Sequence, residues 1–200
     1  MKRFHHFHQK RRAGGFSLME LMIVLAILAM ISAMAAPQLM SMMRESTVFE
    51  AADRVRETLG QTRQFAIDTG IDYEFRYELN GPTMVILPAE SELNLDDSGS
   101  KSTTTEEYVR LLVLLSDDMR LRADDGVEEL SETLDAERFG SLGGAELERK
   151  TWSRPIMFRF DGMADDFVFR VSDKEGLTSE IALRGITGTA RTSQVYQEED

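Results

Sequence analysis

Residues 13–37 read AGGFSLMELMIVLAILAMISAMAAP, and this stretch decides the fold of the chain. From Phe16 to Ala36 there are 21 residues, of which 18 are apolar and none is Lys or Arg. A run of this length crosses a bilayer as a helix. Its one charged residue is Glu20, and an ionised side chain at the centre of a membrane helix costs about 2.5–3.5 kcal/mol on insertion scales. The position of Glu20 therefore needs a physical reason.

A cut after Gly15 supplies that reason. Phe16 would then carry a new α-amine, and Glu20 would lie one helical turn along, with its side chain tilted back toward the N-terminus. The Glu20 carboxylate would then lie near a positively charged α-amine, either that of its own chain or that of a neighbouring chain. Residues 1–15 contain five Lys and Arg residues and no acid. The positive-inside rule keeps this end in the cytoplasm and sends the remainder across the membrane.

This arrangement resembles the class III signal of type IV pilin-like proteins. The match consists of Gly15, Phe16, Glu20, the apolar run and Pro37, the 22nd residue of the cut chain. The resemblance implies cleavage between Gly15 and Phe16 by a membrane aspartic prepilin peptidase and N-methylation of Phe16. It also implies an assembly salt bridge between that amine and Glu20 of an adjacent subunit in a helical filament. The alternatives are a plain anchor and a secretory signal peptide, whose apolar core would be too long here and would contain Glu20.

The sequence divides into four parts. Residues 1–15 are a basic leader, 16–36 a transmembrane helix, 37–69 an amphipathic continuation and 70–200 a globular head with an acidic insertion at about 88–150. Pro37 is expected to kink the helix, because proline removes a backbone donor and clashes with the preceding turn.

An apolar stripe follows Pro37 along one helical face and predicts packing against the head. Its members recur at steps of three, four and seven: Phe49, Ala52, Val55, Leu59 and Ala66. Thr69-Gly70 is a helix stop, since glycine readily adopts the left-handed cap conformation.

The head reads as short antiparallel strands. Residues 71–79 alternate apolar and polar, which predicts a half-buried strand, and Asn80-Gly81-Pro82 predicts a hairpin into 83–87. Residues 108–116 are apolar on both faces in their middle, and we expect a central strand. Three strands are expected towards the C-terminus, separated by turns at Asp161-Gly162 and at 173–176: 156–160, 167–171 and 179–183. The predicted fold is α+β, with a long N-terminal helix packed on an antiparallel β-sandwich head.

Two polar stretches interrupt these strands. Residues 88–107 read as a solvated loop and 123–150 as a solvated surface excursion. Asp124-Asp125-Gly126 offers the oxygen ligands that calcium prefers, but it lacks the spacing of an EF-hand loop. We therefore expect no metal site there.

The C-terminal part of the sequence resembles one particular group of pilin-like proteins. IMFRFDGMADDFVFRVSDKEG at 156–176 and EIALRGITGTART at 180–192 are similar to the signature of the minor pseudopilin H and pilin T group, whose heads are β-sandwiches. The group implies a minor pseudopilin of a type II secretion pseudopilus. A minor type IV pilin that primes pilus assembly is the alternative.

Charge and residue types limit the remaining functions. The net charge of −12 becomes −17 when the five basic leader residues are removed, which disfavours nucleic-acid binding. There is no cysteine, and the three histidines, His5, His6 and His8, lie in the leader. A processed chain would therefore lack His- and Cys-based catalysis and His-ligated metals. We expect no catalytic, cofactor or metal site, although an acid pair in a membrane-anchored enzyme stays an alternative.

The resemblance also implies partners and a location. The partners are prepilin peptidase, other pilin-like subunits and, indirectly, an inner-membrane assembly platform and a cytoplasmic ATPase. The expected location is the bacterial inner membrane, crossed once, with the N-terminus cytoplasmic and the head periplasmic until the subunit enters a pseudopilus. A membrane-tethered β-sandwich binding module is an alternative from another class.

Overall fold

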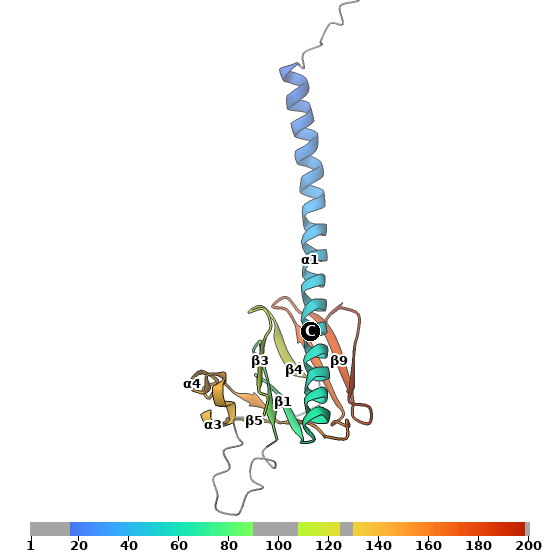
Figure 1. Cartoon of the computed structure of the whole chain (residues 1–200). Helices are drawn as coiled ribbons and strands as arrows, with labels where there is room; N and C mark the ends of the chain where they lie inside the picture. The colour runs from blue at the N-terminus through green and yellow to red at the C-terminus, as the bar shows by residue number, and fades with distance from the viewer. Residues whose placement is uncertain (1–16, 90–107, 125–129, 199–200) are drawn as a thin grey trace, which may run out of the picture. The chain divides into compact units, whose positions relative to one another are not determined.

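The computed structural model describes residues 17–89, 108–124 and 130–198 (Figure 1). One long helix, α1 (Leu18–Thr69), opens the described chain. The chain forms two compact units, residues 1–42 and 43–200, so that α1 begins in the first and ends in the second.

In the first unit, α1 is apolar on every side. It is the one helix in the described part of the chain that is long and apolar enough to cross a membrane, with a mean hydropathy of 2.4 in its most apolar window. Pro37 lies inside the helix, which continues through it. The predicted kink at Pro37 stays a prediction.

In the second unit, one face of α1 is buried by the head. The fully covered side chains include Val48, Val55, Leu59 and Ala66, spaced by seven, four and seven residues. Phe49 was predicted on this face, and that prediction is wrong, since Phe49 is 51 % exposed. At about 100° per residue, it lies a quarter turn from Val48 and points away from the core.

The helix ends where the sequence predicts. Gly70 has φ +72° and donates its N–H to the carbonyl of Ala66 at 3.0 Å, which closes the last turn. A left-handed residue directly after the last helical residue is the usual site of glycine.

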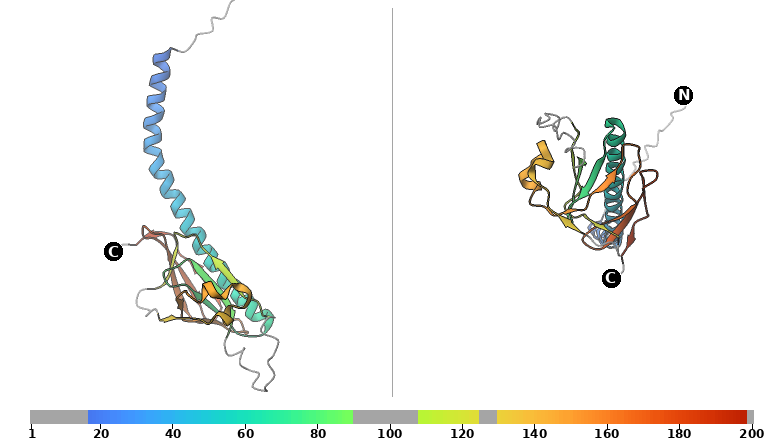
Figure 2. Two further views of the ribbon diagram at one scale, coloured as in Figure 1. Left: turned by 90° about the vertical axis from the view of Figure 1, so that its left-hand side faces the viewer. Right: turned by 90° about the horizontal axis from the view of Figure 1, so that it is seen from below.

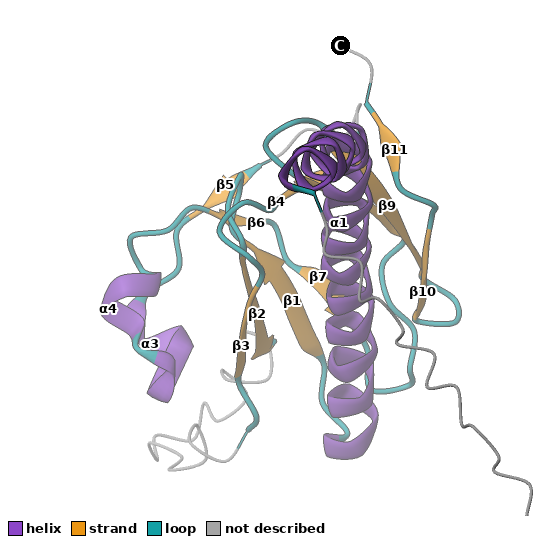
Figure 3. Cartoon of the chain, turned by 90° about the horizontal axis from the view of Figure 1, so that it is seen from above, coloured by secondary structure: helices purple, strands orange, loops and turns teal. Residues whose placement is uncertain are grey.

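Two larger antiparallel sheets form most of the head (Figures 1 and 3). The first has the order β3-β2-β1-β7: β1 Tyr73–Tyr77, β2 Thr83–Pro88, β3 Leu111–Leu114 and β7 Ile156–Phe158. The second has the order β10-β9-β8-β4, with β11 also paired to β9: β4 Arg120–Ala123, β8 Phe167–Ser172, β9 Leu177–Arg184, β10 Thr189–Thr192 and β11 Tyr196–Gln197.

Aromatic rings join the two sheets. Phe169 of β8 contacts Phe75 of β1 edge-on at 5.6 Å between ring centroids, and Tyr77 at 5.7 Å. All three are at most 1 % exposed and share one core with the buried face of α1. The predicted α+β fold, with a long helix and antiparallel sheets, is confirmed.

The predicted turns hold. The β1–β2 hairpin pairs Tyr77 with Met84 across a turn in which Asn80 has φ 56°. Near the C-terminus, the turns before β8 and β9 contain Gly162 and Gly176, both at positive φ. These are local signals, fixed by residues that tolerate left-handed backbone.

The β1 strand departs from its predicted half-burial. Its outward side chains, Glu74 and Arg76, are only 2 % and 5 % exposed. Residues 131–153 cover this face, so that the first sheet lies between α1 and two short helices, α3 (Ala136–Phe139) and α4 (Gly144–Leu147) (Figures 2 and 3).

We call residues 131–153 the outer module. It consists of β5 Ser131–Glu132, α3 Ala136–Phe139, a 3-10 turn Gly140–Leu142, α4 Gly144–Leu147 and β6 Trp152–Ser153. Its buried side chains form a second core with Val85 and Leu87 of β2: Leu134, Phe139, Leu147 and Trp152. The prediction of a solvated excursion over 123–150 is therefore wrong for this module, while residues 90–107 and 125–129 lie outside the described residues.

The segment 108–116 was predicted to form a central strand, and that prediction is wrong. Its strand, β3, lies at the edge of its sheet. Val113 faces the main core, whereas Leu112 packs on the second core. Both faces of β3 are therefore covered by apolar side chains, which explains its apolar sequence although the strand lies at the edge. Leu114, at the end of the strand, is 63 % exposed.

Candidate functional site

The first candidate site is the exposed start of α1. Glu20 lies in the first helical turn and is exposed, and no ion pair holds it within the described residues. The large apolar side chains around it range from 46 % exposure at Val24 to 80 % at Met34. A helix that is apolar all round needs lipid or other helices to cover it.

The structure places only part of the predicted processing site. Gly15 and Phe16 lie outside the described residues, so cleavage and methylation stay predictions. Glu20 does occur at the helix start, the position in which a carboxylate would face an amine at the end of the chain.

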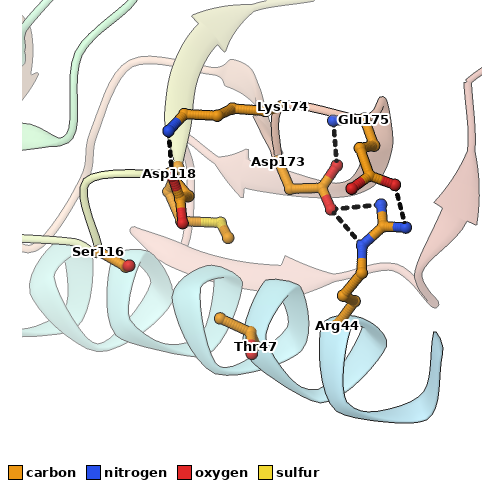
Figure 4. A pocket seen from close by; sticks show the side chains of 8 residues that line it. Arg44, Thr47, Ser116, Asp118, Asp173, Lys174 and Glu175 are labelled. Atoms are coloured by element: carbon orange, nitrogen blue, oxygen red, sulfur yellow. Dashed lines mark hydrogen bonds and ion pairs between the residues drawn. The ribbon is translucent and has the colours of Figure 1, made fainter. Parts of the chain in front are cut away.

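A second candidate site is a cavity of about 250 Å³ in the head (Figure 4). Its lining comes from α1, from the segment before β4 and from the β8–β9 turn: Arg44, Thr47, Ser116, Asp118, Met119, Asp173, Lys174 and Glu175.

Arg44 bridges α1 to the β8–β9 turn across this cavity. Its Nε and Nη2 donate to Oδ2 of Asp173 at 3.1 and 2.7 Å, and its Nη1 pairs with Glu175. The Oδ1 atom of Asp173 accepts the backbone N–H groups of Glu175 and Leu177, each at 2.9 Å. Lys174 pairs with Asp118 on the other side.

Asp173 is held ionised by these contacts. Burial by itself would raise the pKa of Asp173, but the hydrogen bond from Arg44, the two backbone N–H groups and the charge of Arg44 outweigh it and lower the pKa below its ordinary value. The charged side chains of the cavity thus satisfy one another. The arrangement fixes the helix to the turn, and each charged side chain that lines the cavity has an ion-pair partner in the described chain.

We expect Asp173→Asn to remove one acid-sensitive contribution to stability. A carboxylate with a lowered folded pKa stabilises the fold above its unfolded pKa of about 3.9, and that stabilisation is lost as the pH falls through the folded pKa. The melting temperature of the parent chain should fall more between pH 7 and pH 3 than that of Asp173→Asn. An exposed carboxylate without this clamp, Glu148→Gln, serves as control. An equal fall in Asp173→Asn and parent would contradict the assignment.

Sequence reasoning missed this clamp. Asp173 was predicted to lie in a turn, and it does, but Arg44 is 129 residues away in the chain. No local pattern connects the two residues.

In the described part of the chain, no group of three or more His, Cys, Asp or Glu side chains could hold a metal ion. Asp124, the one described member of the acidic segment considered for calcium, pairs with Arg170 at 2.6 Å. Asp125 and Gly126 lie outside the described residues.

Residues 10–36 match the family described as the prokaryotic N-terminal methylation motif. A comparison with curated proteins gives no match.

Among solved structures, two of the minor pseudopilin EpsH from the type II secretion system of Vibrio cholerae are similar to this chain. The first is 13 % identical and covers 74 % of this chain and 96 % of its own, with a TM-score of 0.45. The second is 14 % identical and covers 78 % and 99 %, also with a TM-score of 0.45. The chain carries the prokaryotic N-terminal methylation motif over residues 10–36, which confirms the resemblance to type IV pilin-like proteins that Gly15, Phe16 and Glu20 indicate.

Proposed function

We propose that this chain is a structural subunit of a type IV pilin-like filament, specifically a minor pseudopilin of a type II secretion pseudopilus. The observation that carries the proposal is the helix that begins inside the methylation motif: over residues 18–42 it is apolar and exposed on all sides, and it has a single acid in its first turn. The C-terminal resemblance to the pseudopilin H group supports the finer assignment. A minor type IV pilin shares the same motif and is the second candidate.

The proposed mechanism begins in the inner membrane. The basic leader stays in the cytoplasm, the head crosses to the periplasm, and prepilin peptidase cuts between Gly15 and Phe16. The new amine, N-methylated, then pairs with Glu20 of an adjacent subunit. Two opposite charges in a low-dielectric bundle are costly to bury singly and tolerable together, so the pair favours one axial register.

Assembly moves the helix from lipid to protein. The exposed apolar surface needs new neighbours outside the bilayer, and burial contributes about 25 cal/mol per Å². The work of extraction would come from a cytoplasmic ATPase acting through an inner-membrane platform. The chain's own part is structural, and we propose no catalytic role for the head.

The role of Glu20 can be tested apart from processing. We expect Glu20→Gln to be cut and methylated but to enter filaments at least about a hundredfold less than the parent chain, because a buried amine without its acid costs about 3–5 kcal/mol. The measurement is the processed chain in sheared, pelleted filaments from cells that express the secretion machine. Ser32→Ala changes a polar residue of the same helix and should assemble normally. Normal assembly of Glu20→Gln would contradict the proposed salt bridge.

A further inference from the structure

The strand β3 turns a row of backbone groups away from its sheet. The Leu115 N–H donates to the carbonyl of Pro82 on the β2 side at 2.9 Å, and the preceding residue, Leu114, lies opposite Thr83. Antiparallel pairs alternate between bonded and non-bonded positions, so Leu112 and Leu114 direct their N–H and C=O groups outward. Within the described residues, these outward groups form no hydrogen bond.

The other edges of the two larger sheets are covered or charged. At β7, Asp165 donates its backbone N–H to the carbonyl of Met157 at 3.0 Å and accepts the Met157 N–H through Oδ2 at 3.1 Å. At β4, the Leu121 N–H donates to the carbonyl of Gly81 at 3.3 Å. The β10 strand carries Arg191. Charges and covering segments are the usual means by which a protein keeps its sheet edges from pairing with other chains.

The β3 edge has neither protection among the described residues. Its sequence, LLVL over Leu111–Leu114, contains no charge and no proline. The strand is the outer member of its sheet (Figure 3), and Leu114 is 63 % exposed. An uncharged, apolar edge of this kind is a template for a further strand.

The geometry of the edge determines the shape of its occupant. Leu112 and Leu114 are two positions apart in a strand, so the outward donors and acceptors repeat at about 7 Å, a spacing that an extended backbone matches. Side chains alternate along a strand, so Leu114 lies on the same side as Leu112, which packs on the second core. An apolar side chain of an incoming strand would therefore cover Leu114.

The charge near the edge favours a basic occupant. Asp117 follows β3 in the chain, is exposed and has no ion-pair partner in the described part of the protein. The whole chain has a net charge of −12. An acidic segment would be repelled, whereas a cation in the incoming segment can approach Asp117.

We infer that β3 binds an extended segment of another protein, with apolar side chains at alternate positions and Lys or Arg among the others. The segment joins the first sheet as an additional strand, held by the N–H and C=O groups of Leu112 and Leu114. This inference goes beyond the proposed function, since it adds a peptide-binding edge to the head and does not depend on the cut before Phe16.

A short peptide that repeats Lys-Val-Thr-Val has this pattern and serves as the probe. We expect it to bind the detergent-extracted full-length chain. Binding should slow the amide hydrogen exchange of Leu112 and Leu114, measured by NMR, because both N–H groups gain an acceptor.

Backbone methylation of the probe separates strand pairing from side-chain contact. One form of the peptide is N-methylated at its valines and the other at its lysines and threonines. Only one of these two sets of N–H groups can face β3, because they alternate along a strand. One form should therefore bind at least about tenfold more weakly than the unmodified peptide, and the other should bind like it.

Variants of Leu114 test the edge from the side of the protein. Leu114→Pro removes an outward N–H and no bond to β2, a position at which edge strands tolerate proline, and should weaken binding at least about tenfold. Leu114→Thr loses the same leucine, keeps the N–H and should retain most of the binding. Leu114→Lys keeps the N–H but repels a basic peptide, and its fold should be intact because the side chain is exposed. It should also bind weakly, and it serves as the test if Leu114→Pro does not fold.

Three results overturn the inference: no binding to the parent chain at up to about 1 mM peptide, equal binding by the two methylated forms, or unchanged binding by Leu114→Lys. Slow exchange of Leu112 and Leu114 before the peptide is added also overturns it, because the chain's own residues would then cover the edge.

Discussion

Phe169→Ala is expected to destabilise the head by about 3–5 kcal/mol, the usual cost of removing a fully buried aromatic ring. Phe169 is 0 % exposed, and it contacts Phe75 and Tyr77 of the other sheet. A loss of this size is a large fraction of the 5–15 kcal/mol that stabilises a typical domain. Chemical unfolding of the detergent-extracted full-length chain, followed by circular dichroism, measures it.

Phe49→Ala is the matched control for this prediction. It removes the same ring from a position that is 51 % exposed and should cost less than about 1 kcal/mol in the monomeric, detergent-extracted chain. Equal costs for the two variants would contradict the placement of Phe169 between the sheets.

Trp152→Ala is expected to release the outer module at a cost of about 3–5 kcal/mol. The Trp152 side chain is 0 % exposed, donates its Nε1–H to the carbonyl of Leu147 at 3.0 Å and packs on Phe139 at 5.6 Å between ring centroids. Since the second core contains few other large side chains, the loss should be local. Amide hydrogen exchange should rise over 134–150 and stay unchanged in β8 and β9.

Trp152→Phe separates the ring from its hydrogen bond. It keeps most of the apolar contact and leaves the Leu147 carbonyl without its donor, so the exchange should rise less than in Trp152→Ala. If Trp152→Ala removed protection equally in β8 and β9, the outer module would be part of the main core, and the division into two cores would be wrong.

Local sequence signals predicted the helix and its end. The apolar run and the glycine at 70 define α1 without reference to the head, and Asn80 with Gly81 defines the first hairpin. The sequence did not decide which residue begins the buried face of the helix. Phe49 lies three residues before Ala52 and Val48 lies four before it, and both steps are compatible with one helical face. Only the packed head shows that Val48 is buried and Phe49 is not.

The outer module could not be predicted for a different reason. Its four buried apolar residues lie at irregular spacing within an acidic segment, so composition favours solvent. The charges that it covers are paired across the chain, Arg138 with Glu74 and Arg76 with Glu132. These partners are 64 and 56 residues apart, and their burial depends on each other.

For the candidate site, the sequence singles out Glu20 and the cut before Phe16 because both belong to one continuous motif. It does not single out Arg44, since its partner Asp173 comes from the other end of the chain.

The N-terminal residue of the mature chain tests the central claim most directly. The protein is co-expressed with a prepilin peptidase, and the intact mass and first residue of the membrane-extracted chain are determined, with Gly15→Ala as control. The proposed function predicts a chain that begins at N-methylated Phe16 and a control that stays uncut. An uncut parent chain, or one cut near Ala35 or Ala36, would contradict it and leave a tethered or secreted acidic β domain.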